Sequence, residues 1–230
     1  MQNHPKFKDI HINFEIFSKP GMVDVESDHL GRPKGGVSLI VKNNQFSCRE
    51  IEVLTDRVIA IGLYDMNNSL IQVICSTYMP FYNGKRDQTD LYIETIDALQ
   101  ALIDQYASIA PIKIIGDLNT PLPLSEKLSK NWYKQKSFNL YSSILYDFLA
   151  YNDFIAADML HKQAVDYTYF CHKNGNYTWI DHILCNRLDI LYISSCEIIP
   201  EEPTNYSDHL PIQIKFSIKV SESSPKKGNL

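Results

Sequence analysis

The residues best suited to catalysis include the segment GDLN at residues 116–119, which follows the apolar run at residues 112–115. A carboxylate placed directly after a buried strand is held rigidly and can still be reached from a cleft. Asp117 could accept a proton from a water molecule, and Asn119 could hold the same water or a phosphate oxygen. A simple turn is the alternative, because Gly, Asp and Asn favour turns for backbone reasons.

A second polar segment, SDHLP at residues 207–211, stands immediately before an alternating stretch that predicts a strand. Asp208 offers the carboxylate oxygens that magnesium prefers. His209 could donate a hydrogen bond to a phosphoryl oxygen as negative charge accumulates there. The alternative is that the Ser-Asp pair shapes a loop and His209 fills space.

Asp181 interrupts the otherwise apolar residues 179–184. A carboxylate that faces a core without a partner is costly, so we expect Asp181 to face a cleft and to pair with an imidazole. If that partner is His209, the pair fixes the tautomer of the ring and favours its charged form. A solvent-facing Asp on an edge strand is the alternative. Tyr78 ends a predicted strand and could donate to phosphate, although packing is the commoner role there.

Lysines and aromatic residues alternate after the Asp117 segment, in the pattern of Lys130, Trp132 and Lys134. Cations interleaved with aromatic rings are typical of contact with a nucleic-acid backbone and its bases. We assign Trp179 to the same kind of contact, and a solvated lysine face remains the alternative. Taken together, these segments indicate metal-assisted cleavage of a phosphodiester.

Bulk composition limits the class of protein. The chain has 230 residues with 44% hydrophobic content, which predicts one domain over residues 1–220 and a disordered tail over residues 221–230. Its net charge of −5 argues against strong non-specific DNA binding, but a bound metal can supply positive charge locally. Five scattered cysteines indicate neither a zinc site nor disulfides, and the apparent lack of an apolar leader or membrane span favours an intracellular protein.

The hydrophobic pattern predicts a mixed α/β domain. A long helix follows Asp87, the predicted cap, and is ended by Pro111. A second helix is predicted over residues 141–151. Strands are predicted over residues 11–17, 37–42, 58–64, 70–78, 112–115, 167–170, 176–184, 191–199 and 211–220.

In order along the chain, the motifs TYMP, GDLN, WIDHIL and SDHLP resemble those of the endonuclease/exonuclease/phosphatase superfamily. The segment GRPKGGV at residues 31–37 is similar to the apurinic-type endonuclease domain of non-LTR retrotransposons. The resemblance implies a four-layer α/β sandwich with two facing mixed β-sheets, of the deoxyribonuclease I type. It also implies Mg²⁺- or Mn²⁺-dependent nicking of DNA and a nuclear location.

The resemblance also implies a role for each matched residue. Asp117, helped by Asn119, would position the attacking water, and Asp208 would belong to the metal site. His209, paired with Asp181, would stabilise the transition state, and Tyr78 would contact the phosphate.

The family's motifs begin earlier than those of this chain. Its first strand ends in an Asn and its second in Gln-Glu, whose Glu is a metal ligand, and neither has a counterpart before residue 31. We therefore expect an α/β sandwich that lacks the first strands, is incomplete at the N-terminus, and is weakly active or inactive. A reverse transcriptase domain, expected in a full-length relative, is absent from this chain.

Two other functions remain open from the sequence. One is a phosphatase or phospholipase of the same superfamily, acting on inositol phosphates or sphingomyelin. The other is a non-catalytic nucleic-acid-binding remnant that keeps the scaffold without turnover.

Overall fold

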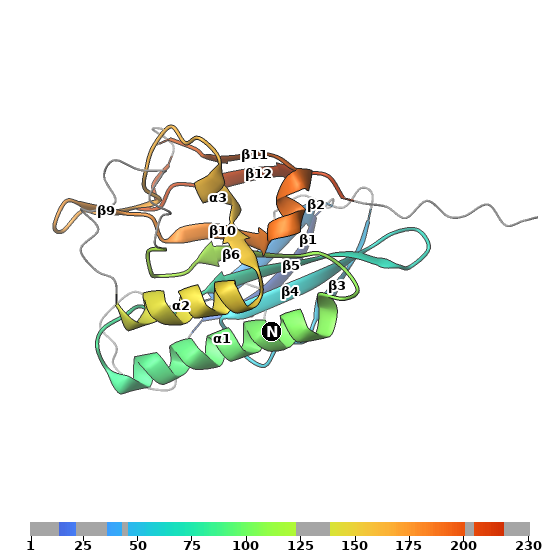
Figure 1. Ribbon diagram of the computed structural model, residues 1–230, viewed down its shortest axis with the longest axis horizontal. Helices are drawn as coiled ribbons and strands as arrows, with labels where there is room; N and C mark the ends of the chain where they lie inside the picture. Colours follow the sequence, from blue (N-terminus) through green and yellow to red (C-terminus); the bar gives the residue numbers. More distant parts are fainter. Residues whose placement is uncertain (1–13, 22–35, 43–45, 123–138, 201–204, 219–230) are drawn as a thin grey trace, which may run out of the picture.

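A six-stranded mixed sheet forms the centre of the computed structural model, which describes residues 14–21, 36–42, 46–122, 139–200 and 205–218 (Figure 1). The strands in spatial order are β3 (Ser47–Ile51), β4 (Val58–Tyr64), β5 (Leu70–Tyr78), β6 (Ile112–Asp117), β10 (Asp181–Asn186) and β7 (Phe154–Ala156).

Strands β5 and β6 are the parallel pair of this sheet, and the long helix α1 (Arg86–Tyr106) makes the crossover between them. Strands β4 and β5 instead form a hairpin, as the sequence predicts. The Asp65 carboxylate accepts hydrogen bonds from the backbone N–H groups of Asn67 and Ser69, both at 2.9 Å, and so stabilises the turn.

Two helices cover one face of the central sheet, α1 and α2 (Leu140–Tyr151) (Figure 1). Their inward faces and the strands beneath form the largest apolar core of the described residues, which includes Leu99, Ile114 and Leu145. The side chain of Asn139 caps α2 by accepting from the N–H of Ser142. The predicted cap of α1 is wrong: the N-cap is Lys85, and Asp87 lies within the first turn.

Two separate antiparallel ladders pack on the other side of the sheet. Strands β1 (Phe14–Pro20) and β2 (Gly36–Lys42) contact an apolar cluster around Ile61 and Leu63. Strands β11 (Ile193–Ile198) and β12 (Ile212–Phe216) contact Ile183 and its neighbours. The mixed α/β class is confirmed, and the second sheet of the expected sandwich is present as these two ladders.

Several short elements depart from the prediction. The strand predicted over residues 176–184 is two strands, because β9 (Asn176–Thr178) pairs with β8 (Tyr169–Cys171) in a hairpin whereas β10 joins the central sheet. The sequence pattern missed β3, β7, α3 (Ala157–Leu160) and the 3₁₀ helix η3 (Arg187–Tyr192), which are too short for clear periodicity. Among the described residues, no helix combines the length and apolar character that crossing a bilayer requires.

Candidate active site

The register of three strands brings three of the predicted site residues together at one rim of the central sheet. Asp117 ends β6 and lies opposite Tyr78 of the parallel strand β5. On the other side of β6, Asp117 lies opposite Asp181, the first residue of the antiparallel strand β10. Two carboxylates that face each other across neighbouring strands have Cβ atoms about 5 Å apart, so their charges interact strongly.

Gly116 allows this close approach of β5 and β6. A Cβ atom at position 116 would lie 1.9 Å from the carbonyl oxygen of Thr77, and the backbone has φ of +155°. Because no other residue avoids this clash, the glycine before Asp117 is required by the geometry of the sheet.

Two hydrogen bonds hold Asn119 in place, one to Asp117 and one to Met79. Its backbone N–H donates to Asp117 Oδ1 at 2.8 Å, and its side-chain Nδ2 donates to the carbonyl of Met79 at 2.8 Å. Its φ is +49°, a conformation that Asn tolerates better than most residues. The backbone of Asn119 is therefore fixed against the Asp117 carboxylate, and its side-chain amide is fixed against the end of β5.

His209 reaches the same rim from the segment before β12. Its ring Nδ1 lies 2.8 Å from Asp181 Oδ2, and a single β-bridge to Tyr169 holds its backbone. The Tyr169 ring packs on the imidazole with 4.8 Å between centroids. The expected pairing of Asp181 with His209 is thus present, although the two residues are 28 positions apart.

The surroundings of Asp117 and His209 raise the pKa values of both, which favours the neutral form of the acid and the charged form of the ring. Burial, together with the charge of Asp181, raises the pKa of Asp117 to about 7, against smaller lowering effects of the Asn119 amide and the nearby histidines. For His209, burial opposes the charged ring, but the hydrogen bond and charge of Asp181 outweigh it and raise the pKa above the ordinary value of 6.5. The rim therefore combines a carboxylate that titrates near neutrality with a ring that favours its charged form.

The same residues form a possible cation site. Ligand atoms of Asp117, Asp181 and His209 all lie within 4.8 Å of one another, the one such group of acidic, histidine or cysteine side chains among the residues described. Asp208, the predicted metal ligand, is exposed and is not a member of this group. Its carbonyl oxygen accepts from the N–H of Phe170, which ties it to the β8–β9 hairpin.

The predicted nucleic-acid contacts have two different outcomes. Lys130, Trp132 and Lys134 lie outside the described residues. Trp179 is buried, with 7% of its surface exposed, and its indole Nε1–H donates to Asp158 Oδ2 at 2.9 Å. This corrects the prediction for Trp179, because a buried indole has no free face on which a base could stack.

Sequence reasoning missed Thr168, which binds the backbone at Asp181 and the backbone next to His209. Its buried hydroxyl accepts hydrogen bonds from the N–H groups of Ile180 and Asp181, at 3.1 and 3.0 Å. Its carbonyl accepts from the N–H of Leu210, the residue after His209, at 2.7 Å. A single threonine in a loop carries no sequence signal for this role.

Arg57 is a second residue that the sequence did not single out. Its guanidinium lies 5.7 Å from the centre of the Tyr78 ring, and Nη1 donates to the Tyr78 carbonyl at 3.3 Å. This contact places a permanent positive charge beside the strand end that carries Tyr78. It is a rim cation suited to an anionic substrate.

Comparison with known proteins supports the fold. No protein-family model matches the chain. The AP endonuclease LMAP from Leishmania major superimposes with a TM-score of 0.65 at 16% identity, covering 88% of this chain and 70% of that one. The 3′ phosphatase NExo from Neisseria, bound to a product DNA hairpin, superimposes with a TM-score of 0.61 at 12% identity, covering 92% of this chain and 91% of that one.

The endonuclease domain of TRAS1, a telomere-specific non-LTR retrotransposon, gives a TM-score of 0.59 at 13% identity and covers 93% of this chain and 83% of that domain. At these identities the similarity establishes architecture rather than activity. The chain therefore has the α/β fold of these solved structures, the deoxyribonuclease I-like architecture that its sequence motifs imply.

Proposed function

We propose that this protein is a divalent-metal-dependent phosphodiester hydrolase that nicks DNA. The observation that carries the proposal is the gathering of Asp117, Asp181 and His209 within 4.8 Å at the rim where β6 and β10 meet. The structural neighbours include nucleases that act on DNA, among them a retrotransposon endonuclease domain. An origin of this chain in such an element, and a nuclear location, belong to the same proposal.

Each residue has a chemical task in this reaction. Asp117, with its pKa near 7, accepts the proton of the attacking water at neutral pH. The side-chain amide of Asn119, held by the Met79 carbonyl, orients that water. The charged ring of His209 donates a hydrogen bond to the phosphoryl oxygen on which negative charge builds up. Asp181 holds the ring in place and stabilises its charge.

The donor atoms of the site fit a magnesium or manganese ion. The carboxylates of Asp117 and Asp181 provide the oxygen ligands that these ions prefer, whereas the charged ring of His209 carries a proton on both nitrogens and is left to act as a donor. When bound, the ion would polarise the phosphoryl group and stabilise the leaving oxygen. Asp208 remains the predicted additional ligand.

Nicking of supercoiled plasmid tests this proposal. We expect conversion to the open-circular form in Mg²⁺ or Mn²⁺, loss of conversion in chelator, and a decrease of at least about 100-fold in Asp117→Asn and His209→Gln. Asp153→Asn, in an exposed ion pair with Arg187, is the matched control and should keep full activity.

Other outcomes would redirect the assignment. A 3′-phosphorylated DNA end that is dephosphorylated while plasmid stays intact would favour a DNA phosphatase, the activity of one structural neighbour. Release of phosphate from an inositol phosphate, or cleavage of sphingomyelin, would favour the non-nucleolytic branch. A folded protein that binds DNA and cleaves none of these substrates in either metal would be a non-catalytic binding module.

A further inference from the structure

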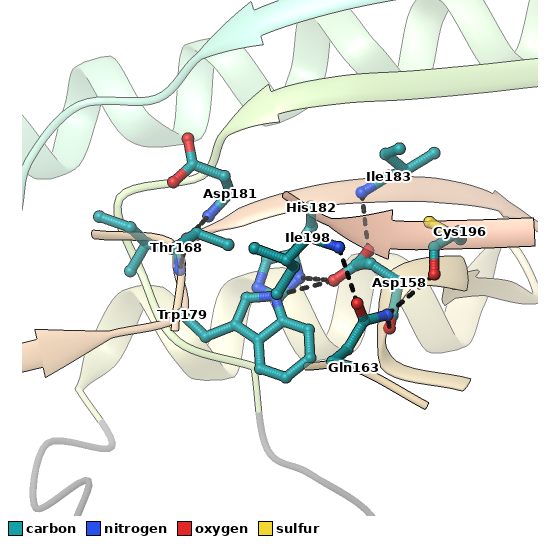
Figure 2. Close-up of polar contacts among 10 residues, drawn as sticks. Asp158, Gln163, Thr168, Trp179, Asp181, His182, Ile183, Cys196 and Ile198 are labelled. Carbon is teal, nitrogen blue, oxygen red and sulfur yellow. Dashed lines mark hydrogen bonds and ion pairs between the residues drawn. The ribbon is translucent and has the colours of Figure 1, made fainter. Parts of the chain in front are cut away.

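A second carboxylate, buried beneath the rim, has no part in the reaction described above. Asp158 lies in α3 and is 0% exposed. Its Oδ2 accepts from the indole Nε1–H of Trp179 at 2.9 Å and pairs with His182 Nδ1 at 2.8 Å, and its Oδ1 accepts from the backbone N–H of Ile183 at 2.8 Å (Figure 2). Three N–H groups thus surround one carboxylate.

The three partners of Asp158 lie on both sides of Asp181 along the chain. Trp179 precedes it by two residues, and His182 and Ile183 follow it directly. One fixed carboxylate therefore anchors the segment that begins β10 before and after the residue that binds His209.

Because side chains alternate between the two faces of a strand, the contacts of Asp158 also fix the direction in which Asp181 points. Consecutive residues of β10 point to opposite faces, so a His182 ring held on the inner side directs Asp181 to the other side. Figure 2 shows the Asp181 carboxylate pointing away from the Asp158 carboxylate. His182 is 0% exposed, and its Nε2 has no hydrogen-bond partner among the described residues, so the contact with Asp158 is its principal polar restraint.

Asp158 is itself held in place from a different direction. Gln163 Nε2 donates to the Asp158 carbonyl at 2.6 Å and to the Cys196 carbonyl at 3.0 Å, and its Oε1 accepts from the N–H of Ile198 at 2.7 Å (Figure 2). These bonds fasten α3 to β11. The carboxylate is therefore a fixed reference point between β11 and β10.

We propose that Asp158 is a positioning residue for the candidate reaction: through Trp179, His182 and Ile183 it sets the direction of Asp181 and thereby the alignment of His209. The kinetic part of this inference rests on the proposed function, whereas the alignment of the pair does not. A purely structural role would stabilise the fold without altering the bond between Asp181 and His209.

Asp158→Asn is the sharpest substitution because it keeps the shape of the side chain. Whichever way the amide faces, its NH₂ group meets at least one of the N–H donors of Trp179, His182 and Ile183. His182 could adjust by changing its tautomer, but the indole and backbone N–H groups cannot. The variant therefore releases the segment that begins β10 without opening a cavity.

The readout is the imidazole N–H proton of His209, which resonates far downfield and exchanges slowly while it is bonded to a carboxylate. Wild-type protein should show two such signals, from His209 and His182, and His209→Gln assigns them. We expect Asp158→Asn to lose both signals, and kcat for plasmid nicking to fall about 10- to 100-fold with KM within about twofold. Thr95→Val, which removes a buried hydroxyl of α1, should keep both signals and full kcat.

A second pair of variants covers the case in which Asp158→Asn does not fold. His182→Asn keeps an N–H donor near the position of Nδ1 and should retain the His209 signal, whereas the similarly sized His182→Leu should lose it. A preserved His209 signal and unchanged kcat in folded Asp158→Asn, or a preserved signal in His182→Leu, would overturn the inference. If wild-type protein cleaves nothing, the proposed function fails, but the NMR comparison still decides the positioning role.

Discussion

At the scale of single residues, Asp117 combines a functional advantage with a cost to stability. Its pKa rises from 3.8 to about 7 on folding, so the folded state binds more protons than the unfolded state between these values, and stability falls as pH rises through this window. Asp117→Asn removes this effect. The unfolding free energy of the variant minus that of wild type should increase by about 1–2 kcal/mol as pH rises from about 5 to about 8. Urea denaturation in the presence of chelator measures this difference. An advantage of Asp117→Asn that does not change over that range would contradict the assigned titration.

Asp181 governs the charge of His209 at the same scale. Because its hydrogen bond and its charge raise the pKa of the ring, Asp181→Asn should lower the pKa of His209 toward 6.5. The stability that the pair contributes is present below pH 6.5 and is lost as pH rises through the folded-state pKa of His209. Titration of the ring resonances by NMR measures the shift. In Asp153→Asn, a remote loss of the same charge, the His209 pKa should stay where it is in wild type.

At the scale of elements, the contact of β5 with β6 decides whether the rim can form. Gly116→Ala would place Cβ 1.9 Å from the Thr77 carbonyl, so the strands must separate, and we expect a loss of about 3 kcal/mol or more in the free energy of unfolding. Gly84→Ala is the matched control, since Gly84 also has positive φ, +75°, but no atom within 4 Å of the added Cβ. Its cost should be about 1 kcal/mol. Equal losses in the two variants, measured by denaturant unfolding, would rule out the close approach as the cause.

At the scale of the whole molecule, charge limits how the protein can hold DNA. With a net charge of −5, affinity cannot come from neutralising many phosphates along the duplex, and Arg57 is the rim cation identified beside Tyr78. For Asp117→Asn in Ca²⁺, we expect DNA affinity to fall by about 50-fold or less between 50 and 200 mM salt, as for about three phosphate contacts. Fluorescence anisotropy gives this slope. A loss of 1,000-fold or more would indicate a much larger electrostatic interface.

The sequence by itself determined the parts of this protein that depend on local pattern. The bounds of β4 and β5 follow from continuous β-rich runs, and the motifs around Asp117 and His209 identify the rim and imply the fold. Tertiary structure alone decided the rest, because the deciding contacts join residues far apart in the chain. Asp158 meets His182 across 24 positions, and the same carboxylate turns Trp179 inward rather than toward a nucleic acid. Spacing in the sequence indicates which residues can share a strand, but the register between strands determines which of them share a site.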